Sequence, residues 1–203
     1  DLLNILMLTS ENISNILAEH ISGDVELFVD GMNKKASLLN MKNTKFKNAT
    51  GEYDKEQYTT MEDMSIFMKK AIENEIFNKI YSNKIETWMN GKNSKVVINE
   101  NKMFWRYEGV DGGKISHISD KQYEIITTVT RNNQCITVMI WDCSMDTLYD
   151  KMTQIFDFIF KNYRTDYLVK KNKVLKTLDV NGVSINFISI NDEMYTFPIG
   201  EGY

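Results

Sequence analysis

Three extended segments followed by one long helix constrain the fold of this chain more than any other feature. Residues 114–118, 123–130 and 134–141 are rich in β-branched and apolar residues, and residues 131–133 form a short turn between the last two. From position 144 or 146 onward, apolar residues recur at spacings of three and four, as on one buried helix face. These residues are Leu148, Met152, Ile155, Phe156, Ile159 and Phe160. The pattern predicts an antiparallel meander covered by a helix.

The first 81 residues show mainly helical periodicity. Ser22-Gly23 interrupts the pattern before Asp24, which is a typical N-cap, and Thr60 to Asp63 fits a capping box. Predicted helices cover residues 2–8, 13–21, 25–39, 60–72 and 75–81. The apolar stripe of the third of these helices is expected to be core. An ordered loop is predicted over residues 40–58, and short β segments at 85–89, 95–98 and 103–107.

The end of the chain has a different character. Residues 168–180 and 183–190 are extended and β-branched, and Asn181-Gly182 between them is a strong hairpin signal. We therefore expect two units, a first domain over residues 1–165 and the start of a small β module over residues 166–203.

Charge and hydropathy exclude several classes of function. A net charge of −4, a pI near 5.3 and scattered Lys and Arg residues argue against a nucleic-acid partner. No apolar run approaches the roughly 18 residues that a membrane span requires. Membrane association is therefore expected only through a segment outside this chain. The apolar helical pattern directly after Asp1, with no basic region before it, indicates a chain that begins inside a domain.

Cys135 and Cys143 are the two cysteines of the chain. On one extended segment, eight residues at about 3.3 Å each separate them by roughly 26 Å, whereas a disulfide needs Cα atoms within about 7 Å. The two thiols are therefore expected to be unpaired, buried and inert. No cluster with metal-ligand spacing is present in the sequence, so neither a metal nor another cofactor is expected.

Two short motifs carry groups suited to acyl transfer. Ser10-Glu11-Asn12 is followed by Gly113-Lys114-Ile115-Ser116, with Lys114 placed 102 positions after Asn12 (114 minus 12). A serine nucleophile activated by a lysine would need a Ser-x-x-Lys element, and no serine of this chain has lysine three positions later. Alone, Ser10 and Asn12 would be typical of a helix start, and Lys114 of a solvated strand edge.

The order of these features, together with the residues around them, resembles a known family. The matching stretches are residues 7–12, 17–21, 28–33, 41–51, 58–64 and 107–112. The chain resembles the D-alanyl-D-alanine carboxypeptidases among the low-molecular-mass penicillin-binding proteins. This resemblance implies an α/β (α+β) fold of the serine β-lactamase and DD-peptidase type, with an antiparallel sheet covered by helices and a β module behind it.

The resemblance also implies a mechanism and a set of roles. The substrate would be a peptidoglycan stem peptide ending in D-Ala-D-Ala, outside the cytoplasmic membrane, and β-lactams would be covalent inhibitors. Ser10 would relay a proton to the leaving D-alanine, Asn12 would donate its amide to the substrate, and Lys114 would attract the substrate carboxylate. Ile115, Ser116 and His117 would line the substrate site. The nucleophile is expected upstream of Asp1.

One departure from the family pattern lies inside the chain. The family strand reads Lys-Thr-Gly, and here it reads Lys114-Ile115-Ser116, which replaces a hydroxyl by an apolar side chain and adds a Cβ where glycine leaves room. Losing a hydrogen bond to a charged group costs about 1.5 to 3 kcal/mol. Three hypotheses stay open: a carboxypeptidase, a degenerate member that binds wall peptide or a protein partner without hydrolysis, and a β-lactam-hydrolysing enzyme.

Overall fold

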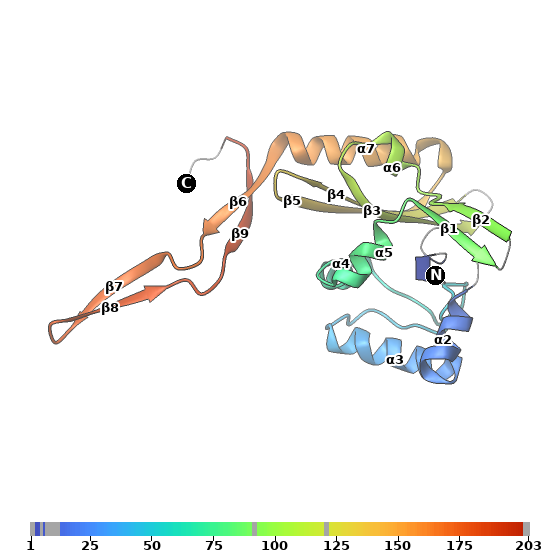
Figure 1. Ribbon diagram of the computed structural model, residues 1–203, viewed down its shortest axis with the longest axis horizontal. Coiled ribbons are helices and arrows are strands. Elements are labelled where there is room, and N and C mark those ends of the chain that lie inside the picture. Colours follow the sequence, from blue (N-terminus) through green and yellow to red (C-terminus); the bar gives the residue numbers. More distant parts are fainter. Residues whose placement is uncertain (1–2, 5, 7–12, 91–92, 120–121, 201–203) are drawn as a thin grey trace.

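The chain forms layers of helix, sheet and helix, and a long β ribbon projects from one end of them (Figure 1). The computed structural model describes residues 3–4, 6, 13–90, 93–119 and 122–200. None of the helices in these ranges is long and apolar enough to cross a bilayer.

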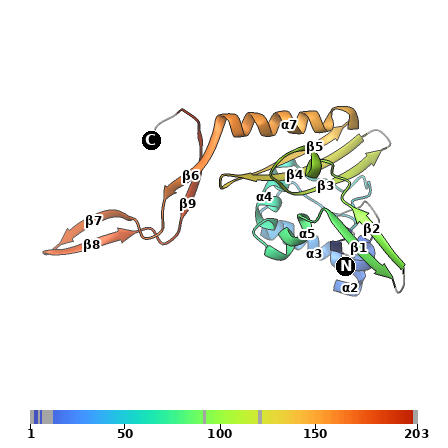
Figure 2. The same ribbon diagram turned by 45° about the horizontal axis from the view of Figure 1, so that its top comes forward.

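The middle layer is an antiparallel meander. It consists of β3 (Val110–Ser119), β4 (Gln122–Arg131) and β5 (Gln134–Cys143), in the order β3-β4-β5. Helix α7 (Met145–Asn162) follows directly and runs along one face of this sheet (Figure 2). The meander and its covering helix are therefore confirmed.

The main core lies between the meander and α7. Ile125 and Val129 point from β4 toward the helix, and Met152 and Phe156 point back from α7, each 2% exposed or less. Full burial of such a side chain contributes about 1.5 to 3 kcal/mol. At this interface lie the apolar residues that repeat every two positions in the strands and about every 3.6 positions in the helix. Both patterns were therefore clear in the sequence.

The segment predicted as a strand at residues 103–107 is instead a short helix, α6 (Met103–Arg106). The side-chain oxygen of Asn101 accepts a hydrogen bond from the backbone N–H of Met103 at 3.0 Å and so satisfies one free donor of the first turn. Met103 and Phe104 are buried in the core cluster. Local capping and burial of two large side chains outweigh the β propensity of this stretch.

A group of helices lies on the other side of the meander, some next to it and others further away (Figure 1). It contains α2 (Ser14–Ser22), α3 (Val25–Leu38), α4 (Met61–Ala71) and α5 (Glu75–Tyr81). Gly23 ends α2 with a φ of 77°, in the left-handed region that glycine adopts without strain. The predicted helices at 13–21, 25–39, 60–72 and 75–81 are confirmed to within a few residues at their ends. Of the helix predicted at 2–8, residues 3, 4 and 6 are described, and these are helical.

The cap of α3 was predicted correctly, whereas its buried stripe was predicted only in part. Asp24 accepts hydrogen bonds from the backbone N–H groups of Glu26 and Leu27. Of the stripe, Val29 and Ala36 are buried. The remaining members, Val25, Phe28, Met32 and Leu39, are half-buried, and the last three line an apolar cavity of about 530 Å³.

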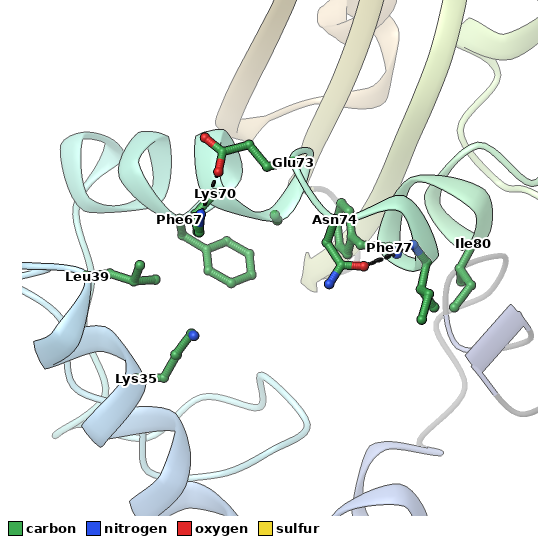
Figure 3. Close-up of a pocket in the computed structure, with 10 residues that line it drawn as sticks. Lys35, Leu39, Phe67, Lys70, Glu73, Asn74, Phe77 and Ile80 are labelled. Atoms are coloured by element: carbon green, nitrogen blue, oxygen red, sulfur yellow. Dashed lines mark hydrogen bonds and ion pairs between the residues drawn. The ribbon is translucent and has the colours of Figure 1, made fainter. Parts of the chain in front are cut away.

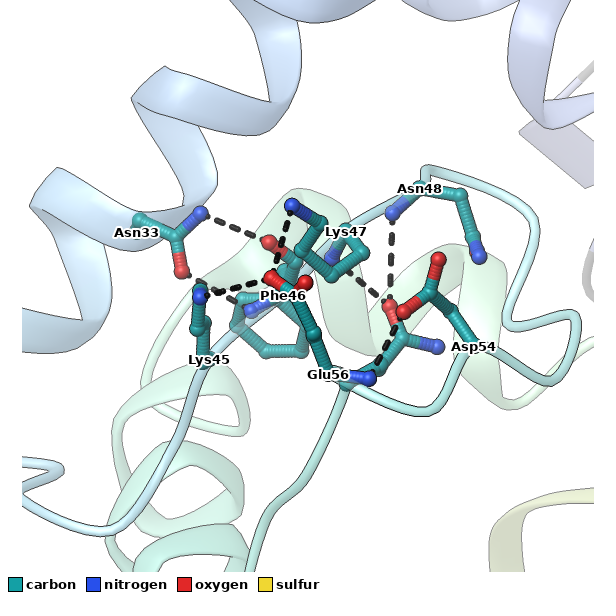
Figure 4. A network of polar contacts seen from close by, with 8 residues as sticks. Asn33, Lys45, Phe46, Lys47, Asn48, Asp54 and Glu56 are labelled. Carbon is teal, nitrogen blue, oxygen red and sulfur yellow. Dashed lines mark hydrogen bonds and ion pairs between the residues drawn. The ribbon is translucent and has the colours of Figure 1, made fainter.

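The loop over residues 40–58 is held by side chains (Figure 4). Asn33 on α3 donates to the carbonyl oxygen of Phe46 at 2.9 Å and accepts from its N–H at 2.8 Å. Asp63 accepts from the N–H of Asn43 and from the hydroxyl of Thr44 at 2.7 and 2.6 Å. Only half of the predicted capping box forms, because Thr60 caps Asp63 while the Asp63 carboxylate binds the loop instead.

A small hairpin lies beside the meander (Figure 1). Its strands are β1 (Ile85–Asn90) and β2 (Asn93–Ile98), which pair antiparallel with Ile85 opposite Ile98. Both strands were predicted.

The projecting ribbon consists of two antiparallel pairs. In the first pair, β6 (Tyr163–Val169) lies beside β9 (Glu193–Pro198), and in the second, β7 (Val174–Val180) lies beside β8 (Val183–Ile188). Asn181 and Gly182, with φ of 55° and 80°, form the predicted hairpin turn. The extended segment predicted at 168–180 is interrupted where Asn172 has a φ of 65°. The domain division after residue 165 stays a prediction, and β6 already begins at Tyr163.

The two cysteines lie at opposite ends of β5 and are both unpaired, as predicted. Cys143 is buried, whereas Cys135 is exposed, so the prediction that both are buried is wrong for Cys135. Residues an even number of positions apart share a face of a strand only while the strand stays regular, and β5 does not stay regular between the two cysteines. A register irregularity between the pairs of Tyr123 and Ile125 interrupts the β4–β5 ladder near Cys143.

Candidate functional site

Two consecutive glycines of β3 lie just before Lys114, and each allows a close approach on a different face. A Cβ on Gly112 would lie 2.1 Å from the ring of Tyr81 on α5, and a Cβ on Gly113 would lie 2.2 Å from the amide nitrogen of Asn101. The Tyr81 hydroxyl also contacts the Thr128 hydroxyl of β4 at 3.3 Å. The strand is thus enclosed from both sides immediately before the lysine.

Two buried asparagines form the contact on the α7 face. Asn99, 3% exposed, donates from its amide to the carbonyl oxygens of Asn83 at 3.1 Å and Gly113 at 3.2 Å, and its side-chain oxygen accepts from the N–H of Asn101. Asn101, fully buried, donates to the Thr127 hydroxyl at 2.9 Å. Every polar atom of both side chains is therefore used in a buried network.

Sequence reasoning treated residues 99–101 as a break between strands and missed this network. A signal was present, since two asparagines flank one glutamate just before an apolar run. The spacing alone did not indicate that both amides are buried.

Lys114 projects from β3 toward the N-terminal residues of the chain. Its Nζ donates to the backbone carbonyl oxygen of Leu6 at 2.7 Å, across 108 positions of sequence. Burial lowers the pKa of Lys114, and the Glu100 carboxylate acts in the opposite direction. The ammonium is therefore partly desolvated, which strengthens its attraction for an anion that reaches it.

Ser116 lies on the same face of β3 as Lys114, since alternate residues of a strand share a face. Its partner on β4 is Glu124. Burial raises the pKa of the Glu124 carboxyl above its usual range. This face therefore presents an ammonium, a hydroxyl and a partly desolvated carboxyl in adjacent positions.

Ile115 and His117 lie on the other face of the strand. Ile115 is 3% exposed within the core cluster beneath α7. The ring of His117 packs edge-to-face against Tyr123 with centroids 4.6 Å apart, and Tyr123 packs against the same core. Of the four strand residues expected at the site, the structure brings Lys114 and Ser116 together and directs Ile115 and His117 away from them.

Ser10 and Asn12 lie outside the described residues. The nearest described residue before them is Leu6, the acceptor for Lys114. Leu6 lies four positions before Ser10 in the sequence.

The arrangement is suited to binding an extended peptide with a terminal carboxylate. Among the described strands, β3 pairs on one side only, with β4, so its outer edge presents backbone donors and acceptors. The Lys114 ammonium lies along this strand. Within the described ranges, no group of three or more His, Cys, Asp or Glu side chains could hold a metal ion.

A separate cavity of about 550 Å³ lies between α3 and the α4–α5 pair (Figure 3). Its lining includes Lys35 and Phe67, and an ion pair of 2.6 Å joins Lys70 to Glu73 at its edge. None of the residues expected at the site lines this cavity. It therefore lies apart from the strand that carries Lys114.

Comparison with known proteins gives consistent matches. The family model described as D-alanyl-D-alanine carboxypeptidase matches residues 1–144. D-alanyl-D-alanine carboxypeptidase DacF of Bacillus subtilis is 30% identical over 189 residues, which are 92% of this chain and 48% of the relative. DacA of Haemophilus influenzae is 28% identical over 97% of this chain and 51% of its own length. The chain thus spans about half the length of these curated relatives.

Solved structures show the same fold. Penicillin binding protein 5 from Haemophilus influenzae has a TM-score of 0.84 at 29% identity, covering 98% of this chain and 59% of its own. Penicillin binding protein 6B from Escherichia coli has a TM-score of 0.81 at 22% identity, covering 99% and 59%. The coverage extends over the projecting ribbon as well as the layered part.

Proposed function

The chain belongs to the D-alanyl-D-alanine carboxypeptidase family, and from this premise we propose that the protein removes the terminal D-alanine from peptidoglycan stem peptides by a serine acyl-enzyme mechanism. The observation that carries the proposal is the Lys114 ammonium, half-buried on an edge strand and 2.7 Å from the carbonyl of Leu6. The place of action is then outside the cytoplasmic membrane, where this substrate occurs.

In this proposal, β3 holds the substrate. The stem peptide pairs along the outer edge of the strand, and Lys114 attracts its terminal carboxylate. Partial burial of the ammonium makes this attraction stronger than it would be in water. Ser116 and the backbone of Ile115 line the strand at the reacting end, with His117 further along it.

Ser10 and Asn12 act from the opposite side in the same proposal. Ser10 passes a proton to the leaving D-alanine, and Asn12 donates its amide to the substrate backbone. The chain contains no Ser-x-x-Lys element, so the nucleophile comes from another segment of the complete protein. The bond from Lys114 to Leu6 supports the roles of Ser10 and Asn12, because it holds Leu6, four positions before Ser10, at the strand.

A second candidate function is the binding of wall peptide without hydrolysis. Ser116 favours it, since its Cβ adds bulk on the face that carries Lys114, where the family pattern has glycine. β-Lactams and D-Ala-D-Ala peptides would then be reversible ligands of the same strand.

The test uses the complete protein with a fluorescent penicillin and, separately, a stem pentapeptide. We expect a covalent adduct and release of D-alanine, both decreased at least about tenfold by Lys114→Ala, because a hydrogen bond to a charged group is lost. Lys161→Ala, at an exposed position on α7, is the control. Saturable pentapeptide binding without adduct or release would support the second candidate. If the protein forms no adduct and binds no pentapeptide, both candidate functions are contradicted.

A further inference from the structure

The hydrogen bonds of Asn99 belong to a longer path that leads back to Lys114. Asn99 donates to the Asn83 carbonyl oxygen, and the Asn83 side chain donates to Glu86 Oε2 at 2.7 Å. The same Glu86 oxygen accepts from the side chain of Asn4 at 3.2 Å. Asn4 thus links the hairpin strand β1 to the N-terminal helical residues.

This path of hydrogen bonds returns to Lys114. Asn4 lies two positions before Leu6, whose carbonyl accepts from Lys114. Lys114 follows Gly113, whose carbonyl accepts from Asn99 at 3.2 Å. These hydrogen bonds, together with the covalent chain from Asn4 to Leu6 and from Gly113 to Lys114, form a closed ring. The ring joins the strand that carries the lysine to Asn4 and Leu6.

We propose that Asn99 is a positioning residue for Lys114, which fixes the Gly113 backbone through its amide and, through Asn83 and Glu86, aligns the segment before Ser10 with the strand. The proposal rests on the proposed function only for the role of Lys114 and not for the geometry of the ring. Asn99 donates to the backbone carbonyl of Gly113, the residue directly before the lysine. It acts through the backbone from which the lysine projects.

The burial of Asn99 makes this role specific. A side chain 3% exposed that donates to two carbonyl groups from different segments has little freedom to shift. Asn101 is equally buried, but its amide binds β4 and its oxygen binds α6. The two asparagines therefore form a matched pair, of which only Asn99 belongs to the ring.

The test measures the side-chain signal of Lys114 by NMR in protein with labelled lysines, assigned through Lys114→Arg. We expect Asn99→Ala to shift the signal and its titration midpoint and to weaken pentapeptide binding about tenfold, the scale of one lost hydrogen bond. Asn101→Ala should lower the melting temperature comparably and leave the Lys114 signal in place. An equal shift in both variants, or none in Asn99→Ala, would overturn the proposal.

A second pair of variants keeps the test decisive if Asn99→Ala does not fold. Both bonds to Glu86 reach one oxygen, so Glu86→Gln can retain them through its amide oxygen, whereas Glu86→Ala cannot. We expect Glu86→Ala to shift the Lys114 signal and Glu86→Gln to restore it. Equal shifts in both would show an effect of charge and contradict the ring. If wild-type protein binds no pentapeptide, the proposed function fails while the lysine signal still decides this proposal.

Discussion

The meander and the projecting ribbon are both antiparallel β structures, but only the meander is covered on its two faces (Figure 1). Ile125 and Val129 of β4 are 2% and 0% exposed, whereas Leu178, Ile185 and Phe187 of the ribbon are 37% to 51% exposed. In the ribbon, Leu178 pairs with Ile185 on one face, and Thr177 pairs with Asn186 on the other. The alternation of apolar and polar residues along a strand therefore determines which face is apolar, but it does not determine whether another element covers that face.

The sharpest test of this comparison replaces one phenylalanine in each region. Phe156→Ala should lower the free energy of unfolding by about 3 to 5 kcal/mol, because Phe156 is fully buried and a cavity is left. Phe187→Ala should change it by no more than about 0.5 kcal/mol, as is usual for surface positions. Urea unfolding followed by circular dichroism measures both. Similar losses would mean that the ribbon is covered in solution.

A smaller effect is expected from the glycines, which are required for different reasons in the two regions. Gly113→Ala should destabilise by about 1 to 3 kcal/mol, since its Cβ would meet the Asn101 amide and lie 3.0 Å from the Ile126 carbonyl oxygen. Gly182→Ala meets no atom within 4 Å and should cost about 1 kcal/mol through its φ of 80° alone. Pentapeptide binding separates them further, because only Gly113→Ala should weaken it.

The smallest expected effect is a change in how stability depends on pH, and it concerns Tyr107, which packs against the core beneath α7. Burial, followed by the hydrogen bond to Asp157, raises the pKa of Tyr107 to about 12. The folded protein then keeps this proton where the unfolded chain loses it, so stability present below pH 10 is lost as the pH rises from about 10 to 12. Tyr107→Phe should flatten that part of the stability curve. An unchanged slope in the variant would show that Tyr107 does not contribute to it.

Features fixed by neighbouring residues could be predicted from the sequence. The Asp24 cap, the Gly23 helix end and the Asn181-Gly182 turn depend on contacts within three or four positions, and each was found where expected. The meander and α7 were equally clear because strand and helix periods both continue over many residues.

Features fixed by distant contacts could not be predicted. Helix α6 depends on a core that forms with α7, and the burial of Asn99 depends on β3. The sequence predicted Lys114, Ile115 and Ser116 as neighbours at the site but did not show that Ile115 faces the core. The assignments of Ser10 and Asn12 stay predictions, since both lie outside the described residues.

The bond between Lys114 and Leu6 has a consequence for the order of folding. It closes a loop of 108 positions, whereas β3, β4 and β5 are consecutive strands that pair with their neighbours in the sequence. Closing a long loop costs more entropy than closing a short one, so we expect the meander with α7 to form early and the contact with the N-terminal segment to form late. A ligand that joins these two segments would therefore slow unfolding and leave the refolding rate nearly unchanged.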